Sequence, residues 1–255
     1  MWRGLRIAAL LAVLVFVAAG AWVERHRTAS WDGTLWIGIF PVAGDSSAAT
    51  TDYLDGLSSE RFASIERFFE REALRHDLPL ARPVKVVLQP RVAEPPPRLA
   101  ADAGMLGSIA WSLRTRWYAR GQAAGSLADI RVFVVYHDPE RMPAVPHSLG
   151  LQKGLIGVVH AFAEPDMDGE NAIVIAHEVM HALGASDKYE PASGQPRFPD
   201  GYAVPQAEPR HPQPAAEIMA GRTALSPTEA EMPESLDEVV VGAATAVEIH
   251  WLEAP

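Results

Sequence analysis

Short apolar stretches bounded by turn-forming residues recur along the first two thirds of the chain. Four of them are rich in Val, Ile, Leu and Phe, which predicts β-strands. They are residues 34–42, 83–89, 130–136 and 155–162. The third stretch is apolar almost throughout, which is typical of a strand at the centre of a sheet with both faces covered.

Two segments between these strands show the periodicity of helices. The first opens at Ser58 or Ser59, either of which can cap a helix, and runs to about His76. The second runs from about Ala100 to Ala119. Its large apolar residues predict a face that is packed in the core. They are Leu106, Ile109, Trp111, Leu113, Trp117 and Tyr118.

Two further helices follow. Residues 172–183 are apolar on almost every face, and Gly184 is expected to end that helix. Near the C-terminus, Ser235 and Glu238 form a capping box that predicts a helix to about Trp251. Together these elements indicate an α+β fold, in which a mixed four-stranded sheet carries packed helices and a C-terminal helix.

The N-terminal residues have a pattern of their own. An uncharged run of 17 residues, 7–23, follows Arg3 and Arg6, and this length is at the low end for a membrane span. The positive-inside rule predicts a single-pass anchor through residues 5–23, with a cytoplasmic N-terminus and the rest of the chain across the membrane. A cleaved signal peptide is the alternative, because residues 1–21 end in a small-residue cleavage pattern and their removal would give a secreted or periplasmic protein.

Charge and composition exclude several classes of protein. The chain is 48% hydrophobic and 21% charged, as in ordinary globular proteins. Beyond the first 23 residues there are 20 basic and 32 acidic residues, a net charge of −12, which argues against nucleic-acid binding. There is no cysteine, so a metal ion would have to be held by His, Asp or Glu.

The candidate chemistry lies in the helix over residues 172–183, which contains the motif His-Glu-x-x-His. His177 and His181 are four residues apart and share one face of the helix, so both can direct a ring nitrogen at one ion. The pair suits Zn²⁺, which takes nitrogen ligands at about 2.0–2.1 Å. Glu178 follows the first ligand, so it can reach a metal-bound water without binding the metal itself.

Asp187, three residues beyond Gly184, is the preferred third ligand. The chain is expected to reverse at Gly184 and return Asp187 to the metal, and a carboxylate oxygen binds zinc at about 2.0–2.2 Å. Four other residues stay open as alternatives: Glu190, Glu208, His211 and Glu217.

The string HExxHxxGxxD at residues 177–187 resembles the elongated zinc signature of the metzincin metallopeptidases. Most metzincins have His at the last position, and the Asp here resembles the snapalysin-like branch. The family also carries a Met-turn, whose Met lies beneath the metal, and residues 217–221 with Met219 match it. The resemblance covers about residues 155–221. It implies that the predicted strand 155–162 is the antiparallel edge of the sheet, where an extended peptide can bind.

Three further residues are expected to have lesser roles. A hydroxyl of Tyr189 or Tyr202 near the metal could donate to an oxyanion, although a packed loop tyrosine is the simpler expectation for each. His160 is expected to be an ordinary strand residue rather than a metal ligand.

These features predict a zinc-dependent metalloendopeptidase that acts on a peptide or protein substrate. Residues 1–27 form the anchor or signal segment, and residues 28–255 form the catalytic domain. Glu178 is expected to take a proton from the metal-activated water and pass it to the leaving amine. The alternatives are a non-proteolytic extracytoplasmic module that binds zinc or a partner, and a zinc hydrolase of another amide or an ester.

Overall fold

A five-stranded sheet lies at the centre of the computed structural model, which describes residues 6, 28–100 and 103–253. The strand order is β2-β1-β3-β5-β4. The strands are β1 (Leu35–Ala43), β2 (Val84–Leu88), β3 (Ile130–His137), β4 (Leu149–Leu151) and β5 (Ile156–Phe162). β4 pairs antiparallel with β5 at one edge, and the other four strands are parallel.

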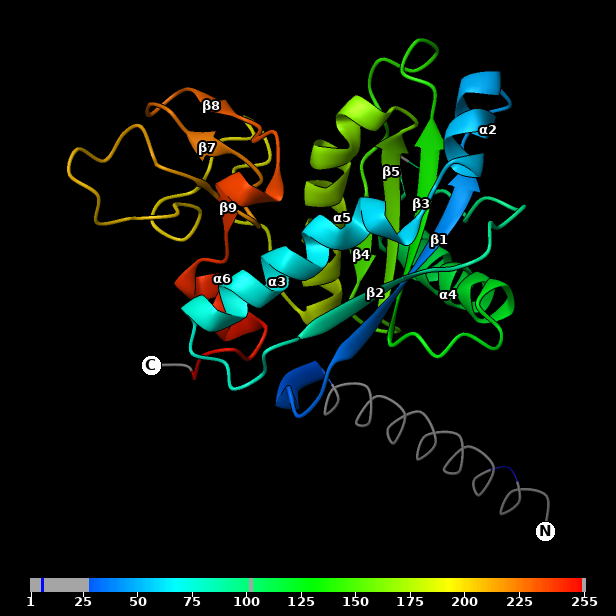
Figure 1. Cartoon of the computed structure of the whole chain (residues 1–255), viewed down its shortest axis with the longest axis horizontal. Coiled ribbons are helices and arrows are strands. Elements are labelled where there is room, and N and C mark those ends of the chain that lie inside the picture. The colour runs from blue at the N-terminus through cyan, green and yellow to red at the C-terminus, as the bar shows by residue number, and fades with distance from the viewer. Residues whose placement is uncertain (1–5, 7–27, 101–102, 254–255) are drawn as a thin grey trace.

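Helices cover both faces of this sheet, with α3 and α5 on one face and α4 on the other (Figure 1). The helical elements that precede β6 in the chain are α2 (Ala48–Asp55), η1 (Ser59–Phe62), α3 (Ala63–Arg75), α4 (Met105–Gln122), η2 (Pro165–Met167) and α5 (Asp168–Leu183). The C-terminal part contains β6 (Ala216–Glu217), β7 (Thr223–Ala224), β8 (Ala230–Glu231), η3 (Leu236–Glu238), β9 (Val239–Val240) and α6 (Ala243–Glu248).

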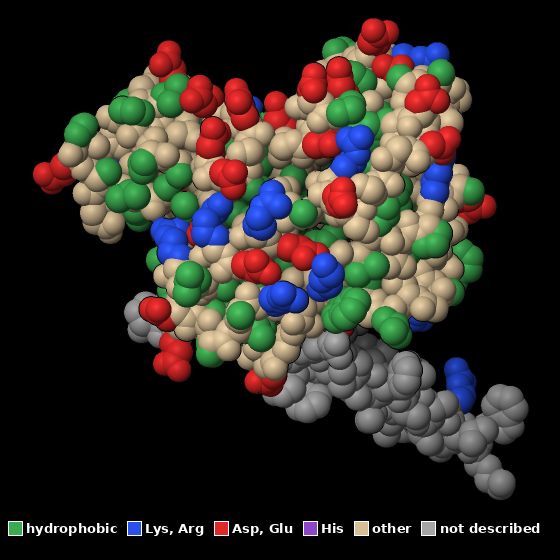
Figure 2. All heavy atoms as spheres, viewed as in Figure 1, with side chains coloured by type: hydrophobic (Ala, Val, Ile, Leu, Met, Phe, Trp, Pro, Cys, Tyr) green, Lys and Arg blue, Asp and Glu red, His purple; other side chains and the backbone are tan. Residues whose placement is uncertain are grey.

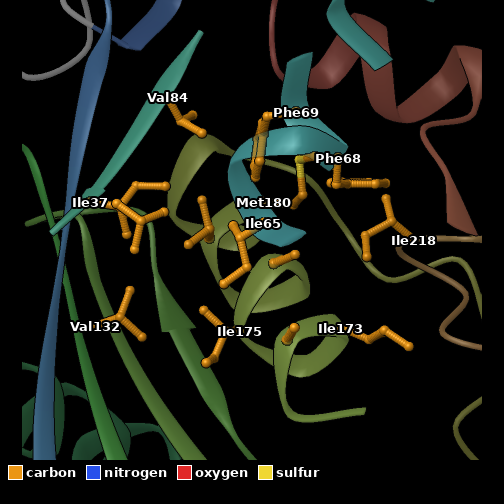
Figure 3. Close-up of a cluster of buried hydrophobic side chains, with 14 of the residues drawn as sticks. Ile37, Ile65, Phe68, Phe69, Val84, Val132, Ile173, Ile175, Met180 and Ile218 are labelled. Atoms are coloured by element: carbon orange, nitrogen blue, oxygen red, sulfur yellow. The ribbon is translucent and has the colours of Figure 1, made fainter. Parts of the chain in front are cut away.

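The core follows from the alternation of side chains along the strands. Ile37 and Ile39 of β1 point to the side of α3 and α5, whereas Phe40 and Val42 point to the side of α4. Figure 3 shows the larger of the two clusters, where side chains of the sheet, α3 and α5 meet. Its members include Ile37, Val132, Ile65, Phe68, Ile175 and Met180. Each such side chain stabilises the fold by about 1.5–3 kcal/mol relative to exposure.

All four predicted strands are present, but the sheet has a fifth strand, β4, in a segment where the sequence predicts no strand. The prediction that residues 155–162 form the antiparallel edge is therefore wrong: β5 is interior and parallel to β3, and β4 is the antiparallel edge. β4 has only three residues, too few to show a pattern in the sequence. Because helices join the parallel strands, the class is α/β rather than α+β.

The predicted C-terminal helix from Ser235 to about Trp251 is present only in its later part, as α6. Ser235 caps only the short turn η3, where its Oγ accepts a hydrogen bond from Asp237 N at 3.3 Å. The next two residues form β9, which pairs with β6, and α6 starts only after Gly242. The reason is that Val239 and Val240 are β-branched and find a strand to pair with.

The two helices predicted before β3 are present with one important difference. The first begins as η1 and continues as α3, and Ser58 makes no capping hydrogen bond. The second is α4, but its apolar residues are not in the core as expected: Trp111 is buried, whereas Leu106, Ile109, Leu113 and Trp117 are exposed. No described element covers their side of the helix. Helix α2 was not predicted, although Ser47 caps it by accepting a hydrogen bond from Thr50 N.

Among the described residues, no helix has the length and hydrophobicity needed to cross a bilayer. The predicted anchor through residues 5–23, within the segment 1–27, falls outside the described residues except for Arg6.

Candidate metal centre

Helix α5 carries the His-Glu-x-x-His motif and ends as the sequence predicts. Gly184 has a left-handed backbone conformation with φ of 113°, which other residues adopt only with strain. Its N–H donates to His181 O at 3.1 Å, and the N–H of Ala185 donates to Met180 O at 2.9 Å. The helix therefore stops one turn after His181, and the chain turns back across its end.

This reversal brings Asp187 to the two histidines. Asp187 Oδ1 lies 3.3 Å from His177 Nε2 and 3.1 Å from His181 Nε2. The three candidate ligand atoms all lie within 4.8 Å of one another. These three residues could hold a metal ion.

The hydrogen bonds on the far side of each ring fix which nitrogen faces the group. His177 Nδ1 lies 2.9 Å from Ile218 O, and His181 Nδ1 lies 2.8 Å from Ala185 O. A carbonyl oxygen can only accept, so each Nδ1 carries the proton and donates it. In the neutral rings, both Nε2 lone pairs then point towards Asp187, the arrangement usual for metal-binding histidines.

The arrangement fits a metal cation. Two lone pairs and a carboxylate oxygen face one another at 3.1–3.3 Å, which is repulsive unless a cation lies between them or both rings take up a second proton. Asp187 Oδ1 is buried and has no hydrogen-bond partner in the described part of the chain. Nitrogen and carboxylate ligands of this kind are those that Zn²⁺ takes in catalytic sites.

Glu178 lies next to the group and is almost fully buried, with 4% of its surface exposed. Its Oε2 has no hydrogen-bond partner among the described residues. Burial raises the pKa of its carboxyl group, and the nearby His177 and His181 oppose that effect only partly. A buried carboxylate with a raised pKa and an unused oxygen is suited to accepting a proton.

Edge strand β4 packs directly against this part of α5. A Cβ atom at Gly150 would collide with His181 Cβ and would lie 2.9 Å from the carbonyl oxygen of Glu178. Only glycine therefore fits at this position. Because residue 150 is a glycine, edge strand β4 can lie close to Glu178.

The charges of the group act on each other and on Tyr189. Burial opposes ionisation of Asp187, but His177 and His181 hold the pKa of its carboxyl well below its usual range. Burial, with the charges of Asp187 and Glu178 and the nearby Asp187 side chain, raises the pKa of the Tyr189 hydroxyl. Tyr189 therefore keeps its proton beside the candidate metal ligands.

An ion pair between the buried Lys188 and the partly exposed Glu248, which the sequence did not reveal, holds the segment containing Asp187. Lys188 Nζ donates to Glu248 Oε2 of α6 at 2.7 Å, and both the N–H and the hydroxyl of Ser186 donate to the same carboxylate. The N–H of Lys188 also donates to Met219 O at 2.9 Å. Glu248 is 60 residues from Lys188, so no local pattern could indicate the pair.

The predicted tight turn at residues 217–221 is present and supports His177 through Ile218 O. Glu217 is fully buried within it. One oxygen of Glu217 accepts from the N–H groups of Met219 and Ala220, and the other accepts from Gly242 N and the Thr245 hydroxyl. Glu217 therefore fixes the turn and is not available as a ligand.

The other alternative ligands also lie apart from the group. His211 Nε2 is 2.9 Å from the Tyr202 hydroxyl, which occupies both side chains with each other. Glu190 and Glu208 are exposed in the segment between α5 and β6, and their side chains form no hydrogen bond or ion pair within the described residues. His160 points to the other face of the sheet, where its Nδ1 is 3.0 Å from His137 Nε2. There, burial and then the charges of His137 and Arg98 lower the pKa of His160 to about 4.

Comparison with known proteins gives distant structural likenesses alone. No family model matches the chain, and no curated protein matches it. A crystal structure of wild-type OgpA from Akkermansia muciniphila matches with a TM-score of 0.42 and 14% identity. Catalytically inactive OgpA in complex with an O-glycopeptide substrate, glycodrosocin, matches with a TM-score of 0.38 and 13% identity. Each match covers 84% of this chain and 59% of OgpA, so this chain spans less than two thirds of that protein.

Proposed function

We propose that this protein is a zinc-dependent metallopeptidase. The observation that carries the proposal is the convergence of His177, His181 and Asp187 beside the buried carboxylate of Glu178. Three protein ligands leave the fourth position of a tetrahedral zinc ion free, as in catalytic rather than structural sites. When bound, zinc would lower the pKa of a water molecule towards neutrality and polarise the scissile carbonyl.

Two side chains of the protein would handle protons during the reaction. Glu178 takes a proton from the attacking water and delivers it to the amine nitrogen that leaves. Its unused oxygen and raised pKa support both steps. The Tyr189 hydroxyl keeps its proton beside Asp187 and can donate to negative charge that develops on the carbonyl oxygen.

We propose that a peptide binds along β4. This strand ends the sheet, and its outer edge has no partner strand in the part of the chain that the structure describes. An extended peptide can add to such an edge through main-chain hydrogen bonds. Gly150 keeps this edge close to Glu178, so a peptide bound there would pass beside the carboxylate.

The location of the protein is a separate proposal that rests on the sequence. The uncharged run 7–23 after two arginines supports a membrane anchor with the catalytic domain outside the cytoplasm. A reporter fused after residue 255 should be active only outside the cytoplasm. Reporter activity inside the cytoplasm would contradict this topology, and a mature N-terminus near residue 22 would replace the anchor by a signal peptide.

Metal analysis combined with a cleavage assay tests the proposed function. The purified full chain should contain close to one zinc ion per molecule and should cleave an unfolded protein such as casein. A chelator should remove the metal and the cleavage together, and added zinc should restore both. A chain without bound metal would contradict the proposal. Bound zinc without cleavage of any peptide library would instead support a binding module or a hydrolase of another amide or ester.

A further inference from the structure

The outward face of α4 carries an apolar stripe that no other described element covers. We call it the outer stripe; it consists of Met105, Leu106, Ile109, Leu113 and Trp117. Four of the five are spaced by four residues and therefore lie along one face of the helix. Another face packs on the sheet through Trp111, Thr115 and Ala119. A row of large apolar side chains that are all exposed is typical of an interaction surface.

The apolar surface continues at the end of the sheet where the described domain begins. Leu127, in the loop after α4, is 92% exposed, and Trp36 near the start of β1 is 46% exposed. The N–H of Trp36 donates a hydrogen bond to Asp129 Oδ2 at 2.9 Å, and the N–H of Asp129 donates to Trp36 O at 2.8 Å. Trp36 therefore lies beside that loop. In Figure 1, α4 lies behind the sheet, and the loop that follows it returns to the lower end of the strands. The nearer face, which Figure 2 shows from the same side, carries interspersed acidic and basic side chains.

The charge of α4 is opposite to that of the whole chain. The helix contains Arg114, Arg116 and Arg120 and no acidic residue, whereas the chain has a net charge of −10. Arg114 and Arg120 are exposed and form no ion pair within the described residues. Long arginine side chains can extend past apolar neighbours to reach anionic groups. The helix therefore combines an apolar outer surface with unpaired positive charge.

We propose that the outer stripe, with Arg114 and Arg120, lies on the surface of an anionic lipid bilayer. An exposed apolar helix face beside basic residues can lie in the interface with its apolar side chains inserted to a depth of about 5–10 Å. Arginines near the surface are attracted to anionic headgroups, and tryptophan favours the interface. A bilayer is favoured over a protein partner because the apolar run 7–23 precedes the domain in the sequence, and the domain begins at the end that carries Trp36 and Leu127. This inference does not depend on zinc or on peptidase activity.

Site-specific spin labelling tests the proposal on the full chain, which has no cysteine of its own. Leu113→Cys places a nitroxide on the outer stripe. Leu74→Cys on α3 is the matched control, because Leu74 is an exposed helical leucine on the other side of the sheet. The protein is reconstituted into bilayers of phosphatidylcholine with and without phosphatidylglycerol, and collisions of the label with oxygen and with a water-soluble nickel complex are compared.

In the anionic bilayer, the label at 113 should lie within the apolar boundary region and the label at 74 should lie in water. The double substitution Arg114→Gln and Arg120→Gln should reduce the inserted fraction by about fivefold for each arginine removed. Equal water exposure at 113 and 74 in both bilayers would overturn the proposal. So would strong spin–spin broadening at 113 in lipid-free detergent, because a second copy of the chain would then cover the stripe. Met105→Cys provides a second position on the stripe if Leu113→Cys does not fold.

Discussion

Helices α4 and α5 lie on opposite faces of one sheet and use their apolar residues in opposite ways. In α5, 10 of 16 residues are buried, including its Glu178. In α4, 3 of 18 residues are buried, and its largest apolar side chains face outwards. Both segments look like core helices in the sequence. The difference lies in their surroundings: α5 is enclosed by the sheet, α3 and the C-terminal segment, whereas α4 is covered on its sheet side alone among the described elements.

The comparison separates two uses of hydrophobic surface. Around α5, burial of the Glu178 side chain raises the pKa of its carboxyl group, while the histidines beside it stay partly exposed. Around α4, the same kinds of side chain remain exposed, and we propose that they contact a lipid bilayer. Substitutions of buried residues on α5 should therefore change catalysis or stability, and substitutions on the outer stripe should change neither.

The largest effect is expected for Glu178→Gln on α5. The neutral amide cannot accept a proton, so peptide turnover should fall by roughly 10²–10⁴ while bound metal stays unchanged. Peptide cleavage rates and metal content measured on the same preparation check this. Glu170→Gln is the control on the same helix, since its side chain makes no hydrogen bond or ion pair in the described structure, and it should keep full turnover. An active Glu178→Gln variant would remove Glu178 from the proposed mechanism.

Removal of the third ligand should weaken metal binding. Asp187→Ala should lower zinc affinity by more than ~100-fold, beyond what loss of an outer hydrogen-bonding partner causes, and Asp187→His should recover part of the loss. Competition with a fluorescent chelator measures the affinity, and Asp200→Ala in the same loop region serves as the control. Full affinity in Asp187→Ala with a loss in His211→Ala or Glu217→Ala would show that the metzincin-like assignment is wrong.

A pair of truncations measures the difference in packing directly. Ile175→Ala on α5 removes a fully buried side chain and should reduce the free energy of unfolding by about 2–5 kcal/mol. Leu113→Ala on α4 removes an exposed side chain and should change it by less than about 0.5 kcal/mol. Urea unfolding of the full chain in detergent, followed by circular dichroism, compares the two. Equal losses would mean that α4 is covered as well as α5.

Two glycine substitutions are expected to have smaller effects on stability than the truncation of Ile175, and effects of opposite sign. Gly150→Ala forces β4 away from His181 and Glu178 and should cost about 1–3 kcal/mol of stability, with a loss of turnover. Gly121→Ala near the end of α4 meets nothing within 4 Å and should stabilise the protein by about 0.5 kcal/mol. Thermal melting shows whether each variant is more or less stable than the original protein, and cleavage rates show whether turnover is lost. Stabilisation by Gly150→Ala would contradict the close packing of β4 on α5.

The sequence by itself determined the elements whose signal is local. His177, Glu178 and His181 share one helix, and Gly184 ends it, because helical spacing and glycine conformation act over a few residues. The four longer strands follow from runs of β-branched and aromatic residues for the same reason. Asp187 is close enough in sequence to be proposed as a ligand, although the sequence left distant alternatives open.

The tertiary structure decided everything that depends on distant neighbours. It showed that Glu217 fixes the turn under His177, and that Glu248 holds Lys188 across 60 residues. It also showed that a three-residue strand, β4, rather than β5, forms the edge beside Glu178. It also showed that most large apolar side chains of α4 are exposed rather than buried. Periodicity shows which residues share a face of a helix, but which face is buried depends on the elements that pack against it.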